Sequence, residues 1–214
     1  GSNCDHDAYH VFRHILDVPV DFVWHRETDL KKYDAIIIPG GFSYGDYLRT
    51  GAIARFSPVM ESVIKEAHAG KPVFGICNGF QILIESGLLP GALIINKDVR
   101  FLSQDVTLEV DSIDSIYTRS LKKGRKLTMP IAHKQGNFIA DENTFKMLED
   151  EDRIAFRYNK GKNGNPNGST NRIAGILNKK RNVLGMMPHP ERAVESILGS
   201  DDGIDIFKSM IGVA

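Results

Sequence analysis

The stretch that decides the fold is Pro72-Val73-Phe74-Gly75-Ile76-Cys77-Asn78-Gly79-Phe80-Gln81. Its first five residues form a short apolar run, typical of a strand buried on both faces of a parallel sheet. We expect the chain to turn abruptly from this strand into a helix at Cys77, with Gly75 and Gly79 preventing clashes around a strained backbone. The positive end of the helix dipole would then favour the thiolate form of Cys77. The segment therefore predicts a nucleophile.

Strands and helices alternate through the first half of the chain. Amphipathic spacing predicts helices over Asp5–Leu16 and Ile53–Ala69. Short apolar runs predict buried strands over Val20–Trp24 and Ala35–Ile38. Such alternation favours a parallel sheet with right-handed crossovers and helices on both faces. In this context, an inert buried cysteine between two packing glycines is the weaker interpretation of Cys77.

The second half of the chain has a different pattern. Apolar and polar residues alternate between Ser103 and Ile139, which predicts antiparallel strands. We therefore expect a single α/β domain over residues 1–214, with a doubly wound, mostly parallel sheet and an added antiparallel segment. The later elements expected are a helix over Asp141–Asp150, strands over Ile154–Tyr158, Ile173–Leu177 and Val183–Met187, and a helix between Gly203 and Ile211.

A second chemical motif is Met187-Pro188-His189-Pro190-Glu191-Arg192. A residue before proline is pushed towards extended conformations, in which alternate side chains share a face, so His189 and Glu191 are expected side by side. A carboxylate bonded to one ring nitrogen leaves the other free to exchange a proton with a nucleophile or leaving group. A proline-rigid surface turn with solvated side chains is the equally open alternative for this motif alone.

A third motif, Pro39-Gly40-Gly41, follows the strand that ends at Ile38. Glycines at a strand end let the backbone turn an amide towards a ligand, so the N–H of Gly41 is a candidate oxyanion donor beside that of Asn78. An ordinary turn is the commoner use of such a pair. The carboxyl edge of a parallel sheet would bring this loop near Cys77, which favours the functional interpretation.

Composition argues against several classes of function. Lysine plus arginine and aspartate plus glutamate both total 27, so no net field favours nucleic acid or an acidic membrane. Only Cys4 and Cys77 are cysteines, which argues against disulfides or a zinc site and fits a reducing, cytoplasmic setting. We expect no membrane segment, no metal site and no nucleotide site, and we interpret the helix-spaced histidines, His6, His10 and His14, as a solvated face.

The motifs together resemble the class I, or triad, glutamine amidotransferases, whose fold is flavodoxin-like. Four longer stretches resemble in particular the glutaminase subunits of phosphoribosylformylglycinamidine synthase, which serve purine synthesis; they are 39–49, 75–81, 165–169 and 185–192. Gly1-Ser2-Asn3-Cys4-Asp5 resembles the family's loop after its first strand, which favours native residues over a cloning remnant. The resemblance implies that the first strand is absent from this sequence.

The resemblance implies that Cys77 attacks the carboxamide of L-glutamine while His189, oriented by Glu191, moves the protons. It implies that Gln81 contributes to glutamine binding, and that ammonia passes to a synthetase subunit joined by a small third subunit. ATP and Mg²⁺ are expected on the synthetase and no cofactor on this chain. The family more often has Gly-Glu after the histidine at position 133 than Lys134-Gln135, which leaves the role of His133 open.

Three alternatives remain. One is a glutaminase subunit of another biosynthetic pathway, against which the 39–49 and 165–169 stretches argue. Another is a cysteine hydrolase acting on peptides or small aldehydes, which would lack Gln81 and the His-Pro-Glu motif. The third is a catalytically silent docking module, which the joint presence of Cys77, His189 and Glu191 opposes.

Overall fold

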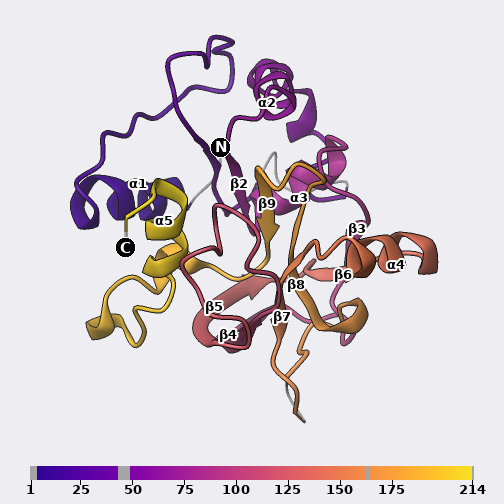
Figure 1. The fold of residues 1–214 in the computed structure, drawn as a ribbon. Coiled ribbons are helices and arrows are strands. Elements are labelled where there is room, and N and C mark those ends of the chain that lie inside the picture. The colour runs from indigo at the N-terminus through magenta and orange to yellow at the C-terminus, as the bar shows by residue number, and fades with distance from the viewer. Residues whose placement is uncertain (1–3, 43–48, 162–163, 214) are drawn as a thin grey trace.

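The computed structural model describes residues 4–42, 49–161 and 164–213, which form one main sheet with helices around it (Figure 1). The helices are α1 (Asp5–His10), which continues as a π-helical turn (Val11–Ile15), α2 (Pro58–His68), α3 (Asn78–Glu85), α4 (Glu142–Asp150) and α5 (Ile204–Ile211). The strands are β1 (Ile36–Ile38), β2 (Val73–Ile76), β3 (Ala92–Ile94), β4 (Leu102–Val110), β5 (Lys126–His133), β6 (Asn137–Ile139), β7 (Ile154–Tyr158), β8 (Ile173–Leu177) and β9 (Val183–Met186).

The main sheet has the strand order β1-β2-β9-β8-β7-β4-β5. The pairs β1–β2 and β2–β9 are parallel, and the remaining pairs from β9 to β5 are antiparallel. β3 and β6 form a separate antiparallel pair. The expected α/β fold with an added antiparallel segment is confirmed; β4 and β5 of that segment continue the main sheet, whereas β6 pairs with β3. The strand expected before Gly1 lies outside the described residues.

Helices pack on both faces of β2. Successive side chains of a strand point to opposite faces, and here both faces are buried. A side chain at Gly75 would lie 2.5 Å from Leu83 Cδ1, so this face is packed against α3. The ring of Phe74 points the other way and lies 5.8 Å, centroid to centroid, from Phe207 of α5. Both phenylalanines are fully buried. β2 therefore runs through the core, and Cys77 follows directly after its carboxyl end.

The strand expected over Val20–Trp24 is wrong. This segment has no strand pairing, and Phe22 and Trp24 are 52% and 64% exposed. Phe22 instead stacks on Tyr9, with ring centroids 4.7 Å apart. An apolar run forms a stable strand only beside another strand, and among the described residues β1 pairs only with β2.

The other expected elements are present, β7 and β8 with the expected bounds and most of the rest with shifted ends. The helix expected over Ile53–Ala69 is divided into a 3-10 turn (Ala54–Phe56) and α2, because Ser57 is extended and Pro58 begins the new helix. The last strand ends at Met186, one residue early. Of the 39–49 stretch, residues 43–48 lie outside the described part of the chain.

Candidate active site

Cys77 lies at a strained turn between β2 and α3. Its φ of +50° and ψ of −104° are unusual for a residue with a side chain, and its backbone N–H donates to Met186 O at 2.8 Å. A Cβ at Gly79 would lie 1.9 Å from Ile38 O, and one at Gly75 would lie 2.7 Å from Gly79 O. The predicted elbow is confirmed, and both glycines are required by close backbone approach.

His189 and Glu191 form a buried pair directly after β9. Nδ1 of His189 lies 2.6 Å from Oε1 of Glu191, and both side chains are 1% exposed. Glu191 lies in a 3-10 turn that Pro190 begins, so the pair is not in the extended segment expected from the sequence. Proline at the first position favours such a turn. The carboxylate fixes hydrogen on Nδ1, which leaves Nε2 for proton transfer.

The electrostatics of the pair favour a charged imidazolium. Burial alone opposes that charge, but the negative charges of Glu191 and then Cys77 outweigh burial and raise the pKa of His189 well above its usual value. Nε2 of His189 is buried and has no hydrogen-bond partner among the described residues. A protonated His189 beside Cys77 is the arrangement of an activated thiol.

The loop after β1 closes one side of the site. Gly40 lies so near the pair that a Cβ there would be 2.8 Å from His189 Cε1 and 3.3 Å from Cys77 Cβ. Gly41 has a φ of +112°, which a glycine adopts without strain. The sequence-predicted Gly41 therefore follows a residue in contact with both Cys77 and His189, and Asn78 begins α3 directly after Cys77.

Gln81 lies one turn into α3 and is held at both ends of its amide. Its Oε1 accepts from Asn78 Nδ2 at 3.0 Å, and its Nε2 donates to Gln135 O at 2.5 Å. Gln81 and Asn78 are buried. Gln81 thus connects α3, close to Cys77, with the segment that follows β5.

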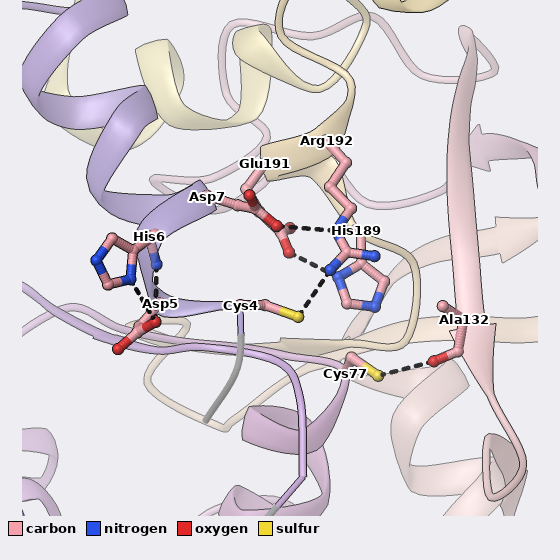
Figure 2. Close-up of polar contacts among 9 residues, drawn as sticks. All are labelled: Cys4, Asp5, His6, Asp7, Cys77, Ala132, His189, Glu191 and Arg192. Atoms are coloured by element: carbon pink, nitrogen blue, oxygen red, sulfur yellow. Dashed lines mark hydrogen bonds and ion pairs between the residues drawn. The ribbon is translucent and has the colours of Figure 1, made fainter. Parts of the chain in front are cut away.

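That segment was only partly foreseen. The carbonyl of Ala132 accepts from Cys77 Sγ at 3.9 Å, as Figure 2 shows. Burial, aided by the nearby His189, lowers the pKa of His133 to about 4, so its ring is neutral at pH 7. The sequence did not reveal the contacts of Ala132 and Gln135. Both are made by backbone carbonyls, which every residue type has.

Polar contacts of Arg192 join the amino end of α1 to the 3-10 turn that contains Glu191 (Figure 2). Arg192 donates from Nε to Asp7 Oδ2 at 3.0 Å and from Nη2 to Cys4 Sγ at 2.8 Å. The Cys4 backbone N–H in turn donates to Gly40 O at 3.3 Å. Burial raises the pKa of the Cys4 thiol against the opposing charge of Arg192. Cys4 therefore connects the loop at Gly40 with the 3-10 turn that contains Glu191, through its backbone N–H and its thiol.

The remaining candidates lie elsewhere. His10 bonds Glu195 Oε2 at 3.1 Å, and His6 bonds Asp5. In the described ranges, no group of three or more histidine, cysteine, aspartate or glutamate side chains is placed to hold a metal ion. No helix among those residues is long and apolar enough to cross a bilayer.

Comparison with known proteins decides the family. Residues 1–202 match the model of the CobB/CobQ-like glutamine amidotransferase domain. The chain belongs to this family. This amidotransferase is 55% identical to the phosphoribosylformylglycinamidine synthase subunit PurQ of Koribacter versatilis, over 99% of its own length and 94% of the relative's. The resemblance drawn from the sequence is thereby confirmed.

Solved structures agree with the fold of the amidotransferase. It superposes on a chain of PurLQS from Thermotoga maritima with a TM-score of 0.88 and 44% identity, covering 99% of this chain and 93% of that one. It also matches the acivicin-bound glutaminase domain of CTPS from Trypanosoma brucei, with a TM-score of 0.62 and 15% identity over 98% and 88% of the two chains. At that identity the second likeness concerns the fold alone.

Proposed function

We propose that this chain is a single glutaminase domain that hydrolyses L-glutamine to glutamate and ammonia for phosphoribosylformylglycinamidine synthase. The observation that carries the chemistry is the strained Cys77 beside the buried His189–Glu191 pair. The 55% identity to a PurQ subunit over nearly the whole chain supports the pathway.

In the first half of the reaction, the Cys77 thiolate attacks the carboxamide carbon of glutamine, and the C=O electrons move onto oxygen. Amide N–H groups of Gly41 and Asn78 would stabilise that oxyanion. His189, charged because of Glu191 and Cys77, gives its Nε2 proton to the nitrogen, and ammonia leaves as the tetrahedral intermediate collapses to a thioester.

In the second half, neutral His189 removes a proton from water, which attacks the thioester carbon. Collapse expels the thiolate, releases glutamate and restores the charged His189. Glu191 holds the ring through both steps, since its bond to Nδ1 stays in place while Nε2 exchanges the proton. Gln81, whose amide is held by Asn78 and Gln135, would border the bound glutamine.

Ammonia produced here would pass to a synthetase subunit accompanied by a small third subunit, as the PurLQS assembly of the Thermotoga maritima relative suggests. ATP and Mg²⁺ would bind the synthetase, where they activate formylglycinamide ribonucleotide. We place the complex in the cytoplasm, in keeping with two unpaired cysteines.

The test is the Cys77→Ala variant in the complex with the synthetase. We expect it to abolish glutamine-dependent synthesis and to spare synthesis from added ammonium chloride, because only the ammonia source depends on the thiol. Loss of ammonia-dependent turnover as well would contradict this division of labour. Glutamine-dependent synthesis that survived the substitution would remove Cys77 as the nucleophile.

A further inference from the structure

Asn96, which follows β3, is a buried hydrogen-bond centre outside the triad. Its side chain is only 2% exposed. Nδ2 donates to His133 O at 2.9 Å and to Arg100 O at 2.8 Å, while Oδ1 accepts from Gly136 N–H at 3.0 Å. Two carbonyl acceptors and one backbone donor fix the orientation of this amide without ambiguity.

The orientation of Asn96 also sets that of the His133 ring. Oδ1 of Asn96 lies 3.2 Å from Nδ1 of His133 and can only accept, so the neutral ring carries its hydrogen on Nδ1. The ring lies flat against Gly136, where a Cβ would approach three of its atoms within 2.3–2.6 Å. Asn96 thus ties both ends of the 133–136 segment to each other.

This segment, with Ala132 directly before it, contacts both Cys77 and Gln81. Ala132, the residue before it, presents its carbonyl to Cys77 Sγ at 3.9 Å. Gln135 O accepts from Gln81 Nε2 at 2.5 Å. On its far side, Gly136 O is held by Asn167 Nδ2 at 2.7 Å. A shift of the segment would therefore release Gln81, whereas the hydrogen bond between His189 and Glu191 involves no residue of the segment.

We propose that Asn96 is a positioning residue for glutamine binding, acting through the 133–136 segment on Gln81. The inference rests on the proposed function and deepens it. Asn96 contacts neither the thiol nor the triad base, so its removal changes recognition of glutamine more than the chemical step.

Asn182 provides a matched control. Its Nδ2 also donates to two backbone carbonyls, those of Ala67 and Lys71, both at 2.8 Å, and its residue is 8% exposed. It precedes β9, so it lies at the amino end of the parallel strands, away from Cys77. Asn96→Ala and Asn182→Ala therefore remove similar bonds, and only the first touches the pocket.

The first measurement is glutaminase kinetics of the full chain. Losing a hydrogen-bonded anchor changes an equilibrium by about tenfold, so we expect Asn96→Ala to raise KM for glutamine by about tenfold with kcat within about threefold. Both variants are expected to lower the melting temperature by similar amounts, and Asn182→Ala is expected to leave KM unchanged. Equal KM values in the two variants would overturn the proposal.

Two alkylating probes separate recognition from reactivity at Cys77. The diazoketone analogue of glutamine, 6-diazo-5-oxo-norleucine, must enter the pocket, whereas iodoacetamide needs only the thiolate. Mass spectrometry of the Cys77 peptide should show slower labelling of Asn96→Ala by the first and unchanged labelling by the second. Equal slowing by both would refute a role in glutamine recognition.

Asn96→Ser guards against a variant that does not fold. It introduces a small neutral side chain, places no carboxylate against the carbonyls of Arg100 and His133, and is too short to keep the whole set of bonds, so the same two measurements apply to it. Wild-type chain that releases no glutamate in a Cys77-dependent way would instead refute the proposed function, and this inference with it. The two failures are therefore distinguishable.

Discussion

Substitution of Gly79 by alanine tests whether the elbow geometry, rather than composition, controls this site. Gly79 lies in the first turn of α3, where helix propensity alone predicts that alanine stabilises by about 1 kcal/mol. The structure predicts the opposite. The new Cβ would lie 1.9 Å from the backbone oxygen of Ile38, and this oxygen cannot rotate away as a side chain could.

The size of the effect follows from the distance. Real Cβ contacts start near 3.0 Å, so α3 and β1 must separate by about 1.1 Å. Overpacking of a rigid core costs about 3 kcal/mol at the upper end of its usual range, which outweighs the helix propensity. The expected net loss of about 2 kcal/mol lowers the melting temperature of a chain this long by about 4–8 °C.

Activity should fall more than stability does. The same displacement moves Cys77 and the Asn78 amide away from His189, and a misplacement of about 1 Å costs about 100-fold in rate. Calorimetry and glutamate release measure the two effects. Gly87→Ala is the control, since Gly87 has a φ of +76° and no atom within 4 Å of a new Cβ. It should cost about 1–2 kcal/mol through φ alone and spare activity. Gly79→Ala with wild-type stability and turnover would refute the reasoning.

Two further predictions concern ionisation. Because the charge of Glu191 raises the pKa of His189, Glu191→Gln should move the alkaline limb of the kcat–pH profile to lower pH and cut kcat by about 100-fold or more; an unmoved limb would contradict it. Between pH 6.5 and 4, unfolded chain binds a proton at His133 that folded chain excludes, so falling pH costs up to about 3 kcal/mol. Urea denaturation of His133→Gln should show a shallower loss of stability over this window, and a parallel loss would disprove the buried neutral ring.

Much of the fold followed from local patterns. Strands β7 and β8 match their expected bounds, because apolar runs between turn residues specify buried strands. Val20–Trp24 has the same local composition and forms no strand, since pairing depends on a neighbour that the segment itself does not supply. Pro58 is the sequence signal for the division of the helix at Ser57. The apolar spacing of residues 53–69 nevertheless also fits one continuous helix, so the spacing alone did not show the division.

The sequence by itself was sufficient to select Cys77 and His189 as the candidate nucleophile and base. Gly75 and Gly79 flank Cys77 at fixed spacing, and two prolines confine His189 next to Glu191, so short-range sterics were sufficient to identify them. Only the tertiary structure decided the rest of the candidate site. Asn96, Ala132 and Gln135 act through buried contacts between segments distant in the chain, and two of them through carbonyls common to every residue. Burial and hydrogen-bond partners come from packing, which local patterns do not specify.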